Sequence, residues 1–343
     1  MEREIEVFLL RGESHMKKRK FIFFIVLILV CILAFAFDVR LKTVTYNVKS
    51  PKINNEIKLT LVTDLHSCYY GENQTKLLVQ IEKYQPDIVL LGGDIFDDVL
   101  DDNNAKVFVD ALAQKYKTYY VSGNHEWWSK RMDNMFDYLT DKGIVVLRGN
   151  TNVIKIGKNI ITVSGIDDPE VNVYGSNYKA WEEQLKEAGE KADENTFNLL
   201  LAHRPESAEK YFEYDFDAVL SGHAHGGQFR IPFILNGLYA PNQGLLPELA
   251  GGMYDFGGRK LIVSRGLSRE STRIPRIFNR PELVFVNLMP MEWKYPPRRN
   301  IKERSYEKQN SNDAFVCSFC NTNSCCYSWI FILFYNDSRY DCR

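Results

Sequence analysis

The stretch FDAVLSGHAHGGQ, residues 216–228, runs from an apolar segment directly into a turn that holds His223 and His225. Histidine is scarce in this chain, with six among 343 residues, so two in one short turn need an explanation. Imidazole is the commonest nitrogen ligand for divalent metals, and the flanking glycines permit a tight turn that directs both rings to one place. The alternative is a glycine-rich turn without function, and this stretch alone does not decide.

An apolar strand that ends in polar residues occurs at four other places in the chain. The five polar clusters are Asp64-Leu65-His66, Gly93-Asp94, Gly123-Asn124-His125-Glu126, His203 and His223-Ala224-His225. Because neighbouring parallel strands bring their carboxyl ends to one crevice, these clusters are predicted to form one site. Carboxylates and imidazoles without cysteine suit Mn, Fe or Zn.

Helical stretches, such as residues 75–85 and 105–117, alternate with the strands and predict an α/β architecture with adjacent parallel strands. Short successive strands around the turn at 157–159 indicate hairpins in a mixed sheet. We find no internal repeat and no long linker, so residues 57–289 are predicted to form one domain, preceded by a strand-forming segment at 38–56.

The N-terminal region has the pattern of a membrane segment. Residues 1–20 end in the basic run Lys17, Lys18, Arg19 and Lys20, and residues 21–37 are uncharged and apolar throughout. This run is long enough to span a bilayer, and the basic residues should stay in the cytoplasm. We therefore expect a single-pass protein of the cytoplasmic membrane with everything after residue 38 outside. The alternative is a signal peptide cleaved after Ala34-Phe35-Ala36.

The ordered motifs DLH, GGD, GNHE, H and GHAHGGQ resemble those of the calcineurin-like metallophosphoesterase superfamily over residues 57–289. The resemblance implies a four-layer α/β/β/α sandwich of two mixed sheets with two divalent metal ions at the strand ends. Each ion would have three ligands of its own and share Asp94 with the other. Asp64, His66 and His225 would hold one ion, and Asn124, His203 and His223 the second.

The same resemblance implies roles in catalysis. A bridging hydroxide would be the nucleophile, His125 would protonate the leaving group or stabilise its developing charge, and Asp97 would orient His125. Arg204, next to His203, is either a phosphate contact or a surface charge.

Differences between this chain and other branches of the superfamily narrow the expected function. The Ser/Thr protein phosphatases have an arginine-glycine pair after the second motif, where this chain reads DIFDDV. The GHAHGGQFRIP segment resembles bacterial membrane-linked phosphodiesterases and UDP-2,3-diacylglucosamine pyrophosphatases. We expect a metal-dependent phosphodiesterase or pyrophosphatase of the cell envelope, manganese being one of its candidate metals. The apolar stretch at 231–241 and the pair Trp127-Trp128 are either ordinary packing or contacts to a lipid-linked substrate.

Two alternatives stay open: a non-catalytic envelope-binding scaffold and a phosphomonoesterase or protein phosphatase. A net charge of -1 gives the chain no electrostatic footprint for nucleic acid. Residues 301–343 are rich in cysteine, lack periodicity and form no complete zinc pattern, so we predict a disordered tail.

Overall fold

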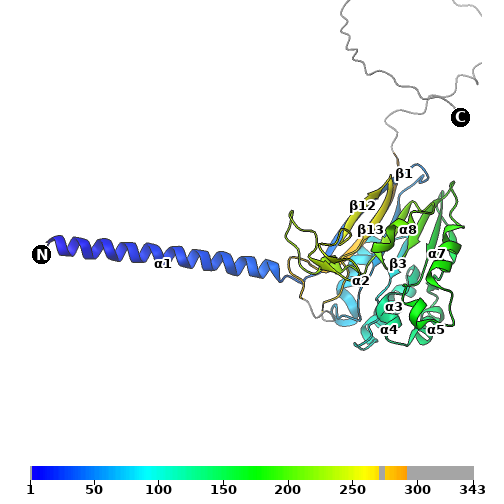
Figure 1. The fold of residues 1–343 in the computed structure, drawn as a ribbon, viewed down its shortest axis with the longest axis horizontal. Coiled ribbons are helices and arrows are strands. Elements are labelled where there is room, and N and C mark those ends of the chain that lie inside the picture. Colours follow the sequence, from blue (N-terminus) through cyan, green and yellow to red (C-terminus); the bar gives the residue numbers. More distant parts are fainter. Residues whose placement is uncertain (1, 270–274, 292–343) are drawn as a thin grey trace, which may run out of the picture. The chain divides into compact units, whose positions relative to one another are not determined.

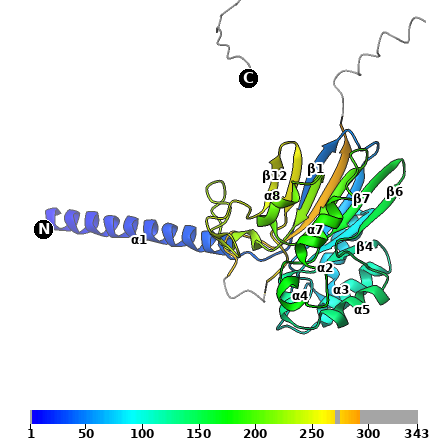
Figure 2. The same cartoon turned by 45° about the vertical axis from the view of Figure 1, so that its right-hand side comes forward.

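The computed structural model describes the backbone of residues 2–269 and 275–291, and the side chains from residue 18 onward. Its core is two six-stranded sheets (Figures 1 and 2). The first sheet has the order β1 (Lys42–Ser50), β14 (Glu282–Pro290), β2 (Ile57–Val62), β3 (Ile88–Gly92), β4 (Lys117–Val121) and β5 (Val145–Val146). The second has the order β12 (Gly252–Phe256), β13 (Arg259–Val263), β9 (Ala218–Ser221), β8 (Phe197–Leu201), β7 (Asn159–Gly165) and β6 (Thr151–Ile156).

Helices and short loops connect the strands. The α-helices of the domain are α2 (Thr75–Tyr84), α3 (Asn103–Ala113), α4 (Asn124–Trp128), α5 (Met132–Asp141), α6 (Val171–Tyr174), α7 (Trp181–Gly189) and α8 (Ala208–Tyr211). Three 3₁₀ turns, η1 (Glu72–Gln74), η2 (Pro205–Ser207) and η3 (His225–Gly227), and the small hairpin β10 (Tyr239–Ala240) and β11 (Gly244–Leu245) complete the described fold.

Strand β3 shows why the strands read as continuous apolar runs. Ile88 and Leu90 pack in the core between the two sheets, whereas Val89 and Leu91 pack in the core beneath the helices. Both faces of the strand are buried, so neither needs polar residues. The same division across both sheets gives the layers helix, sheet, sheet, helix, which confirms the predicted sandwich. Both sheets are mixed, because β14 runs antiparallel to β2 and β12 antiparallel to β13.

The domain extends further toward the N-terminus than the expected boundary at residue 57. Strand β1 pairs with β14 along its whole length, from Lys42 opposite Glu282 to Ser50 opposite Pro290. Its apolar residues are too few and too exposed to predict a central position, and it lies at the edge of the sheet. Residues 42–50 are therefore part of the folded domain and not a lead-in to it.

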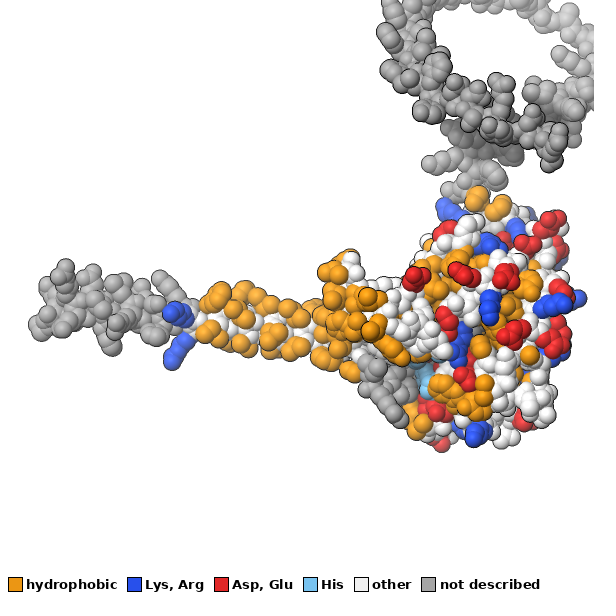
Figure 3. Space-filling view, viewed as in Figure 1, with side chains coloured by type: hydrophobic (Ala, Val, Ile, Leu, Met, Phe, Trp, Pro, Cys, Tyr) orange, Lys and Arg blue, Asp and Glu red, His pale blue; other side chains and the backbone are white. Residues whose placement is uncertain are grey.

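Helix α1 (Glu2–Ala36) is longer than the expected segment at 21–37. Within it, Lys18–Ala36 is long and apolar enough to cross a membrane, with a mean hydropathy of 2.6. Its apolar side chains are exposed (Figure 3), except at the last residue. Ala36 is only 4% exposed, and its carbonyl accepts a hydrogen bond from Phe278 N at 2.7 Å. The predicted tail at 301–343, with its cysteine cluster, lies outside the described residues.

Candidate metal centre

The predicted ligands lie in loops at the carboxyl ends of five strands, three from one sheet and two from the other. Asp64 and His66 follow β2, Asp94 follows β3, Asn124 begins α4 after β4, His203 follows β8, and His223 and His225 follow β9. The strand ends meet where the two sheets pack together, so a short loop from each suffices to reach a common point. The structure therefore brings together six of the seven residues expected to bind metal, and Asn124 begins the helix that follows β4.

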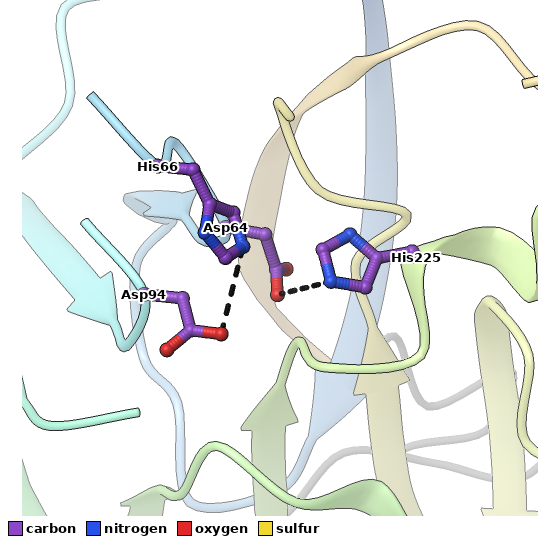
Figure 4. A group of neighbouring side chains, drawn as sticks. All are labelled: Asp64, His66, Asp94 and His225. Carbon is purple, nitrogen blue, oxygen red and sulfur yellow. Dashed lines mark ion pairs between the residues drawn. The ribbon is translucent and has the colours of Figure 1, made fainter. Parts of the chain in front are cut away.

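Six of the seven side chains converge as two groups that share one carboxylate. The first group is Asp64, His66, Asp94 and His225, which point toward one another in Figure 4. The second is Asp94, His203 and His223, and within each group the ligand atoms lie within 4.8 Å of one another. Asp94 Oδ2 lies 3.5 Å from His66 Nε2 and 3.2 Å from His203 Nε2. Asp94 is thus placed to contact ions in both groups.

Six side-chain atoms of the predicted ligands lack hydrogen-bond partners among the described residues. They are Asp64 Oδ2, His66 Nε2, Asp94 Oδ2, Asn124 Oδ1, His203 Nε2 and His223 Nδ1. A buried polar atom without a partner costs about 1–3 kcal/mol, and such atoms are rare in folded proteins. Five of the six belong to residues of the two converging groups, and divalent cations would give these atoms a common partner. The residues present therefore fit a metal centre.

Hydrogen bonds to the nitrogen that faces away from the centre fix three of the imidazole rings. His66 Nδ1 lies 2.9 Å from Asp97 Oδ2, His203 Nδ1 2.8 Å from the Gly92 carbonyl, and His225 Nδ1 2.9 Å from Ser268 Oγ. A bond of this kind to the outer nitrogen leaves Nε2 free for a metal and holds the ring in the required orientation. Asp97 and Ser268 are thus supporting residues of the centre.

The backbone at the ligands is strained. Five of them have the positive φ angles that non-glycine residues rarely adopt: Asp64 (51°), His66 (47°), Asp94 (53°), His223 (65°) and His225 (48°). Such conformations cost about 1–3 kcal/mol each and persist where the surrounding structure enforces them, most often at functional sites. The strain indicates that these loops are shaped for ligand placement at the expense of local stability.

The charges of the centre favour a cation. Burial alone raises the pKa of Asp94, but His203 and His125 hold that pKa well below its usual range. Burial alone lowers the pKa of His203, but Asp94 and Asp64 raise it to about 10. Asp94 therefore attracts positive charge strongly even in this desolvated position, and a bound metal ion would supply that charge.

Glu126 also belongs to the centre, and sequence reasoning assigned it no role. Its carboxylate accepts hydrogen bonds from the backbone N–H groups of Asp94, Ile95, Phe96 and Gly123 at 2.7–3.2 Å. Burial and Asp94 raise the pKa of Glu126 to about 8 although the amide donors lower it in part, and these hydrogen bonds join the loop after β3 to the loop after β4. Its place in the GNHE cluster at a strand end was the signal that could have found it.

His125 lies beside the ligands but is more accessible than they are. Its side chain is 23% exposed, against at most 7% for the ligand histidines. Its ring meets that of His66 edge-on with centroids 4.3 Å apart. Burial alone lowers the pKa of His125, but Asp94 and Asp98 raise it above its usual value. His125, His66 and Asp97 form a third group whose ligand atoms lie within 4.8 Å of one another, and His125 is its most accessible member.

The partner of His125 differs from the expected one. His125 Nδ1 lies 2.6 Å from Asp98 Oδ1 but 3.8 Å from Asp97 Oδ2. Asp97 is turned instead toward His66, and its other oxygen accepts the backbone N–H groups of Val99 and Leu100. Motif position alone could not separate two adjacent aspartates, because their side chains point in different directions from one loop.

Residues 57–227 match the family model of the calcineurin-like phosphoesterases. The chain contains a calcineurin-like phosphoesterase domain. It is 31% identical over 258 residues to an uncharacterized metallophosphoesterase of Campylobacter jejuni, a match covering 71% of this chain and 62% of that protein. It is 28% identical to an uncharacterized metallophosphoesterase of Aquifex aeolicus, covering 72% of this chain and 92% of that protein.

A bovine transmembrane protein with a metallophosphoesterase domain is 29% identical over 194 residues, covering 52% of this chain and 42% of that protein. The matched regions thus span less than two thirds of the Campylobacter and bovine proteins. Strands β12, β13 and β14 follow the residues matched by the family model and complete both sheets of the phosphoesterase domain.

Arg204 is not a surface charge in the phosphoesterase domain. It is buried, and its guanidinium donates to Asp168 Oδ2 at 2.6 Å and Oδ1 at 2.9 Å. Its Nη1 also donates to Asn242 Oδ1, which is 2.9 Å from His223 Nε2. Arg204 therefore links the loop after β8 to the loop that carries Asn242, beside a predicted metal ligand.

The two tryptophans after the GNHE motif have separate environments. Trp127 is buried, and its indole N–H donates to Ser122 Oγ at 2.8 Å, which makes it part of the domain core. Trp128 is 40% exposed, and its ring lies 4.7 Å from that of His125 between centroids. Only Trp128 is thus placed to contact a ligand at the metal centre.

The two neighbouring aspartates should give different defects when replaced. Asp97→Asn should weaken metal binding by about 10- to 100-fold, the usual effect of removing a hydrogen bond to a ligand histidine. Asp98→Asn should leave metal content unchanged and lower kcat, because it disturbs only His125. Metal titration by calorimetry and steady-state kinetics on both variants would separate the roles. A loss of metal affinity in Asp98→Asn alone would reverse the assignment.

Proposed function

We propose that the phosphoesterase domain hydrolyses phosphoester bonds with two divalent metal ions. The observation that carries this proposal is the pair of ligand groups that share Asp94, five of whose six residues have a buried atom without a hydrogen-bond partner. Bound ions would supply an activated water near neutral pH and the positive charge that stabilises phosphoryl oxygens in the transition state. Asp64, His66 and His225 would hold one ion, Asn124, His203 and His223 the second, and Asp94 both.

The chain's own residues would complete the reaction. His125 is the accessible acid at the edge of the centre, and its backbone N–H donates to Asp94 Oδ1 at 2.9 Å, which fixes its place relative to the ligands. Protonation of the leaving oxygen by His125 would avoid the release of an alkoxide, and Asp98 would hold the ring for that transfer. A non-catalytic scaffold would not need this acid and its aspartate beside an intact set of ligands.

We infer that the preferred substrates are phosphodiesters or pyrophosphates, since the motifs resemble bacterial enzymes of those classes more than the protein phosphatases. The full-length protein in detergent should hydrolyse bis-p-nitrophenyl phosphate faster than p-nitrophenyl phosphate after loading with Mn. Both rates should fall to background in excess chelator, because the ligands then lose their ions, and should return with added metal. Faster monoester hydrolysis would favour the phosphomonoesterase alternative, and hydrolysis that survives chelation would exclude the metal mechanism.

We further propose that α1 anchors the domain to the outer face of the cytoplasmic membrane. Lys18, Arg19 and Lys20 precede the apolar part of the helix and should remain inside. Ala36, the last residue of the alternative signal-peptide cleavage site, is helical, buried and hydrogen-bonded to Phe278, which favours an uncleaved anchor. The bovine relative is also named as a transmembrane protein.

The anchor gives a testable topology. Protease added to intact cells stripped of their wall should digest the domain, while a cytoplasmic marker protein stays whole. Without protease, the domain should sediment with membranes after lysis and resist extraction by high salt, since an apolar helix is not held by charge. A domain that is protected until the cells are lysed would reverse the orientation, and its release by salt would exclude the anchor.

A further inference from the structure

One loop of the domain exposes an unusual amount of apolar surface. We call residues 231–247, between η3 and β12, the apolar loop; it contains no charged residue. Its exposed hydrophobic side chains are Ile231 (39%), Phe233 (108%), Ile234 (82%), Leu238 (39%), Tyr239 (43%), Leu245 (73%) and Leu246 (63%). Single exposed apolar residues are ordinary, but a contiguous group of this kind marks a contact with a protein, a ligand or a membrane.

The exposure is built into an ordered segment. Strands β10 and β11 pair as a hairpin, and Leu246 N donates to the Leu238 carbonyl at 2.8 Å. Asn236 at its base donates to the Gly251 carbonyl at 2.9 Å, and Asn242 contacts the predicted ligand His223. The loop thus presents its apolar side chains outward while its base is tied to the rest of the domain and to the metal centre.

The base of the apolar loop also lies next to the end of α1. Phe229 bridges to Ile277, and Arg230 N donates to the Ile277 carbonyl at 3.0 Å. The next residue, Phe278, donates its backbone N–H to Ala36 at the last turn of α1. Around this junction Phe35 and Phe37 are 70% and 52% exposed. Figure 3 shows hydrophobic side chains, in orange, along α1 and a further group of them on the domain beside the end of that helix.

We propose that the apolar loop inserts into the surface of the same membrane that α1 crosses. This inference rests on the anchor proposed above, since a helix that leaves the bilayer at Phe37 holds the loop within reach of it. The absence of charge from the loop means that no ion must be desolvated on insertion. Tyr239 has the amphipathic ring that is favoured at the membrane interface.

Insertion would place the metal centre at the bilayer surface. Asn242, in the apolar loop, contacts both His223 and Arg204, so the metal centre lies beside this loop. If the proposed hydrolysis is correct, the arrangement suits a phosphoester at the level of lipid headgroups, with its acyl chains left in the bilayer. A soluble substrate would gain nothing from the loop.

Photo-crosslinking of the full-length protein tests the insertion without relying on activity. Benzoylphenylalanine would replace Phe233 or Leu246, whose exposure leaves room for it, in vesicles of phosphatidylethanolamine and phosphatidylglycerol. Phe24 in α1 serves as the control for the anchor. Val153 in β6, which is 70% exposed at the sheet edge opposite β12, serves as the control for a surface in water. Phospholipid adducts, detected by mass spectrometry, are expected at positions 24, 233 and 246 and not at 153.

The possible results separate this inference from the proposals on which it rests. Adducts at position 24 but not at 233 or 246 would overturn the insertion and keep the anchor. No lipid adduct at any position would overturn both. Adducts between position 233 or 246 and another polypeptide, in place of lipid, would show that the loop is a protein interface. None of these readouts depends on whether the domain hydrolyses phosphoesters, so a failed activity assay leaves the test intact.

Discussion

Replacing Asp94 with asparagine should abolish phosphoester hydrolysis and lower the bound metal. Asp94 Oδ2 is the atom that both groups of ligands approach, at 3.5 Å from His66 Nε2 and 3.2 Å from His203 Nε2. An amide keeps the size of the side chain but removes the negative charge that offsets the two cations. The loss of several kcal/mol of transition-state stabilisation corresponds to a fall in kcat of about 10³-fold or more.

The measurement is elemental analysis of the purified variant together with its rate on bis-p-nitrophenyl phosphate. Asp255→Asn is the matched control, because the same chemical change on an exposed side chain of β12 should leave metal content and rate unchanged. Asp94 is fully buried and its backbone also contacts Glu126, so circular dichroism should confirm that the variant is folded. Wild-type rates in a folded, metal-depleted Asp94→Asn protein would exclude the shared-carboxylate centre.

Local patterns predict an α/β domain and the polar clusters at its strand ends, whereas the four layers and the division of the ligands between two ions follow from the family resemblance. Strands buried on two faces must be apolar throughout, and polar residues at their ends are then easy to locate. Asp64, Asp94 and His203 are examples: each lies within three residues of the end of a strand. Since parallel strands bring their carboxyl ends together, finding the strand ends is nearly sufficient to find the site.

Features that depend on side-chain direction or on the pairing of distant strands cannot be predicted from local sequence patterns. Asp97 and Asp98 are neighbours in the chain, and only the loop conformation shows that one contacts His66 and the other His125. Strand β1 pairs with β14, about 240 residues away, and nothing in the sequence pattern of β1 predicts this pairing. The buried pair Arg204 and Asp168 likewise forms between loops from different strands.

The apolar loop falls between these two cases. Its composition is visible in the sequence, where residues 231–247 lack charge altogether. What the composition cannot tell is that these side chains face outward, since an apolar stretch of this length is equally consistent with core packing. The contacts of Phe229 and Phe278 then bring the base of the loop to the end of α1, which no motif predicts.

Replacing His125 with alanine should keep both metal ions bound and lower kcat by about 10²- to 10⁴-fold, the range for a positioned acid or base. The ring makes no bond on which the ligands depend: its Nδ1 contacts Asp98, and the hydrogen bond to Asp94 comes from the backbone N–H, which alanine retains. The loss should therefore appear in the chemical step and not in metal content.

The size of this defect should depend on the leaving group. Nitrophenolate is stable without a proton, so His125→Ala should lose little on bis-p-nitrophenyl phosphate and much more on a dialkyl phosphodiester, whose alkoxide needs protonation. Asp98→Asn should show the same dependence with a smaller amplitude, because it leaves the imidazole present but less well oriented. An equal loss on both substrates would mean that His125 stabilises charge on the phosphoryl group, and a collapse of metal content would make it a ligand.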